Sequence, residues 1–262
     1  MDRRNMIKRA GAAVAGLSIF GVDAIAGNSM GNSSVGAGDK DGAGLSGKGK
    51  VMVIGAHPDD PESMFGGAMM LFRAAGWDVV SVYMTKGEAG IPGKSHAEAA
   101  AIREQEARNA CKILDVHPIF MTQIDGSSEI NKERYAEMKQ VIAAEKPNIV
   151  FTHWPIDSHA DHRVCSSLVY DAWRRLDYPF DLYYGEAMTG LQSQCFHPSH
   201  YLDITEFSER KREATYCHKS QLPGDWYDEW HGEMEKFRGK EHGCKRAEAY
   251  VLLSRGHNDI AQ

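Results

Sequence analysis

The sequence predicts an α/β protein built on a mainly parallel sheet, and three observations carry that prediction. Two short, nearly continuous apolar runs, residues 51–56 and 148–151, have the pattern of strands buried on both faces. Each run leads, directly or after a loop, into a cluster of His and Asp residues. Helical and strand patterns also alternate along the chain, which is typical of parallel strands joined by right-handed crossovers.

The individual elements are expected from periodicity and from local signals. Ser95 and Glu98 form a capping box that opens a helix ending at Leu114. Residues 85–94 hold four Gly or Pro residues and predict a loop near the strand ends. The expected helices are 62–75, 95–114, 132–145, 161–176 and 206–220, and the expected strands are 51–56, 78–84, 117–121, 148–151, 180–186 and 201–204.

The chain is expected to divide into three parts. Residues 1–26 carry an Arg3–Arg4 pair, a basic tail and a weakly apolar run, which predict an export signal of the twin-arginine type cleaved near Ala26. An uncleaved anchor is less favoured, because a membrane-spanning helix needs ~20 strongly apolar residues. Residues 27–48 are rich in Gly and Ser and predict a flexible linker. Residues 49–262 suit one domain, which we expect in the periplasm or outside the cell, with no stable membrane span.

Charge and cysteine content argue against a nucleic-acid partner and against a metal site made of thiolates. The formal net charge is −6 and no Lys/Arg run is visible, so nucleic acid is not an expected partner. The five cysteines have no CxxC spacing, so no thiolate metal site is expected. We expect Cys111 and Cys165 to be buried, whereas Cys195, Cys217 and Cys244 are candidates for one bridge in an oxidising compartment.

The two polar clusters have the composition of a metal site. In an open α/β sheet, chemistry collects beyond the carboxyl ends of the strands. His57 and His162 offer nitrogen ligands and Asp60 offers an oxygen, and three protein ligands with an open position are the usual catalytic zinc arrangement. Asp59 is left beside the ion, where it is a candidate to deprotonate a bound water. Each cluster alone is also compatible with a turn, because Pro and Asp are turn residues.

Together these motifs resemble those of the PIG-L/LmbE-type zinc-dependent de-N-acetylases. The resemblance covers about residues 49–253, and further segments match in the expected order: Thr85–Glu88, Arg103–Glu106, Asp203–Thr205, His218–Gln221 and Ala247–Tyr250. It implies a Rossmann-like three-layer sandwich. It also implies a hydrolase that removes an N-acetyl group from an N-acetylglucosamine-type glycan or glycoconjugate, with Zn²⁺ or another divalent ion such as Fe²⁺.

The resemblance further implies a role for each residue of the two clusters. His57, Asp60 and His162 hold the ion. Asp59 acts as the general base and returns its proton to the departing amine. His159, as an imidazolium or as a correctly placed N–H, stabilises the oxyanion. Asp161 either orients His159 and raises its pKa or caps the helix that begins there.

Further residues allow two interpretations from the sequence. Arg103 matches a family arginine and is expected at the substrate, with a solvated helix face as the alternative. Asp157 stands where some members have a Tyr that assists catalysis, so we expect it to bind substrate or to leave the oxyanion to another residue. Trp226 and Trp230, at i and i+4, suit a helix face packed on the core better than a sugar-stacking surface.

Two other classes of function stay open. One is a metal hydrolase of another amide, an ester or a lactone, and the other is a non-catalytic glycan-binding protein on the same fold. A binding protein is expected to have lost a ligand or Asp59, and here all are present. The expected partner is a small molecule or glycan that carries an N-acetylated amino sugar.

Overall fold

The computed structural model describes residues 49–177 and 179–253 of the 262-residue chain. The expected export signal, residues 1–26, and the expected linker, residues 27–48, lie outside the described residues. The described residues fall within the predicted single domain, residues 49–262.

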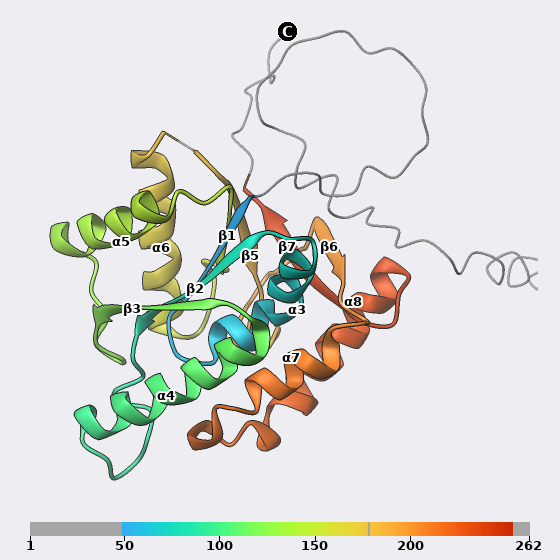
Figure 1. The fold of residues 1–262 in the computed structure, drawn as a ribbon, viewed down its shortest axis with the longest axis horizontal. Coiled ribbons are helices and arrows are strands. Elements are labelled where there is room, and N and C mark those ends of the chain that lie inside the picture. Colours follow the sequence, from blue (N-terminus) through green and yellow to red (C-terminus); the bar gives the residue numbers. More distant parts are fainter. Residues whose placement is uncertain (1–48, 178, 254–262) are drawn as a thin grey trace, which may run out of the picture. The chain divides into compact units, whose positions relative to one another are not determined.

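A seven-stranded sheet runs through the domain in the order β3-β2-β1-β4-β5-β7-β6 (Figure 1). The first five strands pair in parallel, and β7 is antiparallel to both β5 and β6. The direction of strand addition reverses at β1, and ligands bind such sheets in the crevice at the reversal. The strands are β1 (Lys50–Gly55), β2 (Asp78–Thr85), β3 (His117–Gln123), β4 (Ile149–His153), β5 (Asp181–Gly185), β6 (His200–Asp203) and β7 (Ala247–Leu252).

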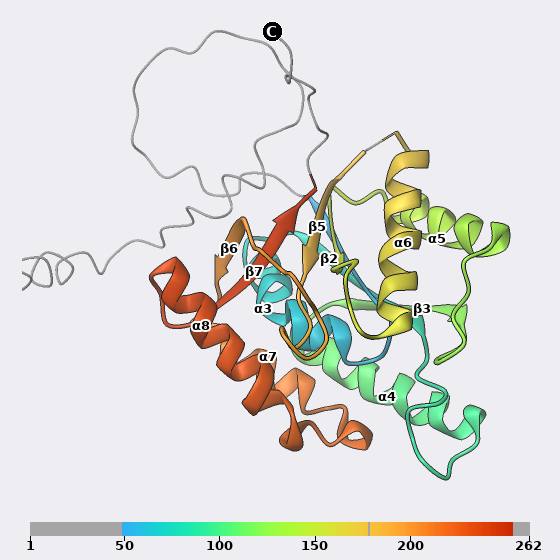
Figure 2. The same cartoon turned by 180° about the vertical axis from the view of Figure 1, so that it is seen from behind.

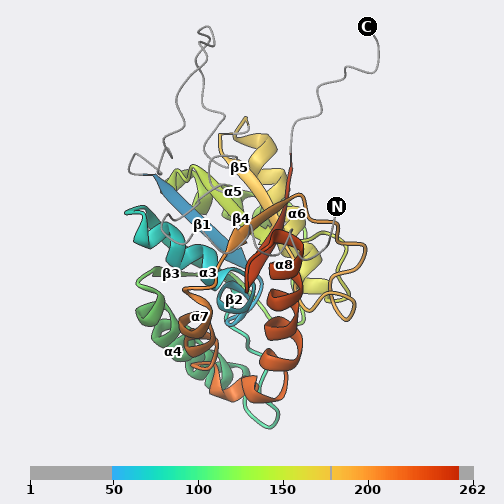
Figure 3. The ribbon, with the colours of Figure 1, turned by 90° about the vertical axis from the view of Figure 1, so that its right-hand side faces the viewer.

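Helices cover both faces of this sheet and form the predicted three-layer sandwich (Figure 3). One face carries α5 (Lys132–Glu145) and α6 (Ala160–Arg175). The other face carries α3 (Asp60–Ala74), against which α7 (Ser208–Thr215) packs, and α4 (His96–Leu114) in turn contacts α7. Figure 2 shows α8 (Glu233–His242) beside β6 and β7 on this second side.

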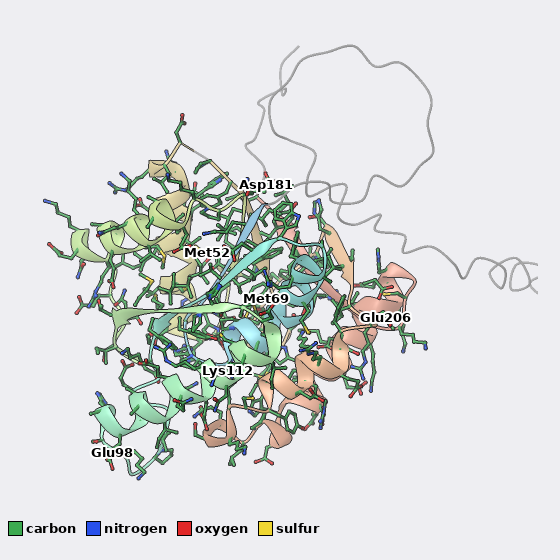
Figure 4. The ribbon with its side chains drawn as sticks, in the orientation of Figure 1. Met52, Met69, Glu98, Lys112, Asp181 and Glu206 are labelled. Atoms are coloured by element: carbon green, nitrogen blue, oxygen red, sulfur yellow. The ribbon has the colours of Figure 1, made fainter. Side chains whose placement is uncertain are left out.

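The two layers between sheet and helices differ in chemistry. Aliphatic side chains such as Met52, Ile54 and Leu168 fill the layer under α5 and α6. Aromatic rings fill the layer under α3, where the Phe65 ring lies 5.7 Å from that of Phe151. Figure 4 shows side chains on both sides of the sheet, with Met52 labelled on β1 and Met69 on α3. The strands that lead into the polar clusters are therefore packed on both faces of the sheet.

The expected elements are largely confirmed, with differences in the last third of the chain. The capping box is present, because Ser95 Oγ accepts from Glu98 N at 3.3 Å and the Glu98 carboxylate accepts from Ser95 N at 3.0 Å. The helix expected over 206–220 ends at Thr215, and Leu222 then adopts a left-handed backbone with φ 51° before Pro223. The sequence analysis did not anticipate α8 or the antiparallel strand β7.

The described residues also bear on the expectations about membrane spans and cysteine pairing. None of their helices has both the length and the apolar character needed to cross a membrane. All five cysteines, which lie within the described ranges, are free thiols. The bridge considered among Cys195, Cys217 and Cys244 is therefore not formed, while Cys111 and Cys165 are buried as expected.

Candidate active site

A cavity of about 390 Å³ opens beyond the carboxyl ends of β1 and β4. Besides Arg103 of α4, its walls come from six separate connections of the chain. They are the β1–α3 turn, the loop after β2, the loop after β3, the start of α6, the loop after β5 and the segment between α7 and α8. Both predicted clusters reach it, through His57, Asp59 and Asp60 on one side and His159 and His162 on the other.

The β1–α3 turn separates two neighbouring carboxylates. Asp60 begins the helix and its Oδ2 accepts from the backbone N of His57 at 2.7 Å. Asp59 has φ 118° and ψ −30°, a backbone conformation that costs a non-glycine residue about 1–3 kcal/mol. The two carboxylates have different partners, because Asp59 Oδ2 accepts from Arg103 whereas the Asp60 carboxylate lies against imidazoles such as those of His57 and His162.

The three predicted metal ligands converge. His57 Nδ1 lies 3.3 Å from Asp60 Oδ2, and Asp60 Oδ1 lies 3.4 Å from His162 Nε2. The rings of His57 and His162 are 5.4 Å apart between centroids. Among the described residues, possible ligand atoms gather as three overlapping groups, none of which contains all three predicted ligands: His57 with His159 and His162, Asp60 with His153 and His162, and His57 with Asp125 and Asp161. Two nitrogen donors and one carboxylate thus share one end of the cavity.

His153 and Asp125 belong to this cluster but were missed by the sequence analysis. His153 is the last residue of β4; its ring stacks on that of His162 at 4.0 Å, and its Nε2 lies 3.2 Å from Asp60 Oδ2. Asp125 follows β3 and places Oδ1 3.2 Å from His57 Nε2. Both strands run two residues beyond their predicted ends. Had the ends of β3 and β4 been predicted correctly, both residues would have been candidates, as His57 was, because sites lie at the carboxyl ends of parallel strands.

The charges at this end of the cavity fit a bound cation. Burial lowers the pKa of His57, but nearby carboxylates, Asp125 first, outweigh it and hold the pKa well above its usual range. Burial also opposes protonation of His162, yet Asp60 and the other carboxylate beside it raise the pKa to about 9. Protonated imidazoles among carboxylates are expected where protons stand in for a metal, because metal binding releases such protons. The donor set therefore suits a divalent ion.

His159 and Asp161 are arranged differently from the prediction. His159 is itself the N-cap of α6, and its Nδ1 accepts from the backbone N of Asp161 at 3.2 Å. The Asp161 carboxylate lies 3.2 Å from His57 Nε2 and accepts from Gly126 N at 2.7 Å. Burial and the nearby imidazoles lower the pKa of His159. Asp161 therefore neither caps the helix nor pairs its carboxylate with His159, and His159 favours the neutral form.

Arg103 is buried, with 3% of its surface exposed, so the solvated helix face is excluded. Its Nη2 donates to Pro58 O at 2.5 Å and to Asp59 Oδ2 at 3.0 Å. A Cβ at Gly87 would lie 2.4 Å from Arg103 Nη1, so glycine at that position leaves room for the guanidinium. Arg103 thus lines the cavity while it holds the strained turn.

Asp157 lies behind the ligands. Its Oδ1 accepts from His159 N at 2.8 Å and is 3.2 Å from His162 Nδ1, and its Oδ2 accepts from Ser193 Oγ at 3.2 Å. The side chain is fully buried and does not line the cavity. This placement favours positioning of His162 over direct contact with substrate, since carboxylates commonly orient the imidazoles that bind metals.

The aromatic segment departs from the packing interpretation. Residues Tyr227–Gly232 form a π-helix, in which hydrogen bonds span five residues, so positions i and i+4 do not define one buried face. Trp230 is 36% exposed, and Trp226 is half-buried on the cavity wall beside His231 and Gln221. The expectation that both tryptophans pack on the core is wrong for Trp230.

Comparisons with known proteins show a family match and similar deacetylases. Residues 52–173 match the PIG-L family, described as GlcNAc-PI de-N-acetylase. The diacetylchitobiose deacetylase of Thermococcus kodakarensis is 30% identical over 217 residues, which are 76% of this chain and 81% of that protein. The structure of N,N'-diacetylchitobiose deacetylase from Pyrococcus horikoshii has a TM-score of 0.69 at 24% identity, covering 84% of this chain and 91% of that one.

A further solved structure limits what the fold alone implies. GalB, the 4-carboxy-2-hydroxymuconate hydratase of Pseudomonas putida, has a TM-score of 0.70 at 21% identity, covering 81% of this chain and all of that one. A hydratase and a deacetylase therefore share the fold, and the reaction must be argued from the site.

Proposed function

The chain belongs to the PIG-L family, and from this membership and the site geometry we propose that it is a zinc-dependent N-deacetylase of N-acetylglucosamine-type glycans. One observation carries the proposal. His57, Asp60 and His162 lie close together at one end of a cavity whose wall also holds Asp59, a carboxylate that Arg103 holds and that belongs to none of the candidate metal-binding groups of the described residues. A metal-activated hydrolysis needs such a separate base beside the ion.

The ligand types suggest which ion is bound. Two imidazole nitrogens and one carboxylate suit Zn²⁺, and imidazole with carboxylate also suits Fe²⁺. When bound, such an ion lowers the pKa of a water toward ~7 and polarises the acetamide carbonyl. His57, Asp60 and His162 are the proposed ligands, with Asp157 and Asp161 orienting the two imidazoles.

Asp59 is proposed as the general base. Burial raises the pKa of its carboxyl, and Arg103 opposes that shift. The guanidinium also fixes one carboxylate oxygen, so the other is left to take a proton from the attacking water. Asp59 then delivers that proton to the amine as the C–N bond breaks, which releases acetate and the free amino sugar.

His159 is proposed as the donor to the developing oxyanion. Its Nδ1 already accepts a hydrogen bond from the backbone of α6, so a neutral ring carries its proton on Nε2. This N–H needs no positive charge, which agrees with the lowered pKa of His159. The N-terminus of a helix thus sets both the tautomer and the direction of the donor.

The substrate and the compartment follow from separate observations. A cavity of about 390 Å³ is near the lower end of the ~300–1,000 Å³ typical of ligand sites, which suits a short glycan. The relative from Thermococcus kodakarensis is named for its action on diacetylchitobiose. The Arg3–Arg4 pair and the small residues near Ala26 support export, so we propose a periplasmic or extracellular enzyme.

The test combines activity with metal content. Acetate release should be measured over N-acetylated glycans, an ester and a lactone, before and after chelation and reloading with Zn²⁺ or Fe²⁺. Asp59→Asn should keep the metal, by elemental analysis, yet lower turnover by ~10²-fold or more. Asp115→Asn is the matched control, because Asp115 is exposed and has a left-handed backbone that Asn also adopts. Loss of metal from Asp59→Asn would mean that Asp59 is a ligand, and activity on the ester or lactone alone would reject N-deacetylation.

A further inference from the structure

Trp226 presents an aromatic surface to the cavity from a segment that carries none of the proposed ligands. Its ring is half-buried, and its Nε1 donates to Gln221 O at 2.9 Å. Because the only polar atom of the indole is already bonded to the backbone, the ring can offer the cavity only apolar surface. This is the surface that a sugar ring, with its axial C–H groups, packs against.

Two buried aromatic rings pack edge-on against the indole. Tyr227 and His231 lie 6.1 Å and 5.8 Å from the Trp226 ring, both edge-on. Tyr227 and His231 stack on each other at 5.8 Å, and Tyr227 OH donates to the buried Glu235 at 2.9 Å. The π-helix that contains them is a form found frequently at functional sites. The platform is therefore held in place before any ligand arrives.

Gln221 supplies a polar group next to this surface. Its side-chain nitrogen donates to Gly90 O at 3.1 Å and to Ser220 Oγ at 3.0 Å, which uses both N–H groups. Ser220 is in turn held by Glu106 of α4, through its N at 2.8 Å and its Oγ at 2.6 Å. The Gln221 amide oxygen remains for a donor from a ligand, such as a sugar hydroxyl.

We propose that Trp226 and Gln221 form a second sugar-binding subsite, which holds the pyranose ring linked to the N-acetylated one. The proposal rests on the proposed function, since the first ring is the one whose acetamide reaches the metal and Asp59. An apolar platform beside one fixed acceptor matches a pyranose, which has an apolar face and hydroxyl groups around its rim. The preferred substrate is then a disaccharide or a short oligosaccharide, and a free monosaccharide leaves the platform empty.

The test compares two substrates in three tryptophan variants. Trp226→Ala should lower kcat/KM on N,N'-diacetylchitobiose by about 10-fold, mainly through KM, because one stacked ring is lost. The same variant should change kcat/KM on N-acetylglucosamine by about twofold or less. Trp230→Ala, which removes an exposed ring of the same π-helix outside the cavity, should change neither substrate. Trp226→Phe should recover most of the loss, because it keeps an aromatic face.

A binding measurement separates the subsite from the reaction. Calorimetric titration of wild-type and Trp226→Ala protein with N,N'-diacetylchitobiose needs no turnover. Weaker binding by Trp226→Ala supports the subsite even where no acetate is released, an outcome that would reject only the proposed function. Equal losses of kcat/KM on both substrates would place Trp226 at the reacting ring. Unchanged affinity of Trp226→Ala for the disaccharide would mean that Trp226 only packs against its neighbours. Either result overturns the proposal.

Discussion

Lys211→Met should destabilise the protein strongly, because it leaves two buried carboxylates without their cation. Lys211 is 1% exposed, and its Nζ lies 2.9 Å from Glu235 and 2.7 Å from Glu248. Breaking a buried ion pair by removing one partner typically costs about 3–5 kcal/mol. Both carboxylates keep other donors, since Glu248 accepts from Gly67 N and Ala68 N at 2.8 Å and Glu235 accepts from Tyr227 OH. We therefore expect the lower end, about 3 kcal/mol.

The measurement is thermal or denaturant unfolding of the two lysine variants. A loss of about 3 kcal/mol lowers the midpoint by about 6–12 °C in a domain of this size. Lys236→Met is the matched control, because Lys236 is 47% exposed and its partner Glu233 is also in solvent, so the midpoint should hardly move. If both variants shifted the midpoint alike, the buried cluster would not hold α7, α8 and β7 onto α3 as the contacts indicate.

Two predictions concern the ligands and the compartment. Asp161→Asn should weaken metal affinity, measured by chelator competition, by about 10–100-fold, because the carboxylate beside His57 Nε2 loses its charge; affinity within twofold of wild type would remove Asp161 from this role. Protein isolated from its native source should begin near Gly27 and lie outside the cytoplasm, and N-terminal sequencing that found Met1 on cytoplasmic protein would refute export.

The site residues that could be predicted from the sequence are those that lie next to one another along the chain. His57 to Asp60 follows an apolar strand without interruption, and its residue types alone indicated a candidate metal site. Asp125 and His153 were not predicted, because the end of a strand depends on hydrogen bonds to the neighbouring strands. The sequence of one strand does not show these hydrogen bonds. The contacts of Asp157 and Asp161 were not predicted for a related reason, since sequence spacing shows which residues are near one another but not which atoms meet.

The C-terminal third was the least predictable region. Its helix α7 is short, and the π-helix after it has no simple apolar period. Strand β7 joins the sheet antiparallel between β5 and β6, a place set by tertiary packing. Glu248 on this strand accepts from Gly67 N and Ala68 N, and a Cβ on Gly67 would lie 2.4 Å from Ile204. The absence of a side chain at Gly67 therefore has a steric reason that appears only in the folded structure.

The strand order explains why clusters a hundred residues apart build one site. β1 and β4 are neighbours in the sheet, with Ile54 opposite Thr152, so their carboxyl ends stand side by side. Thr152 Oγ1 donates to Ile54 O at 2.9 Å and ties the two ends together just before His57 and His153. Because β2 is added on one side of β1 and β4 on the other, the connections leave in opposite directions and open the crevice between them. The proposed ligands therefore come from this one strand pair, with His57 and Asp60 after β1 and His162 after β4.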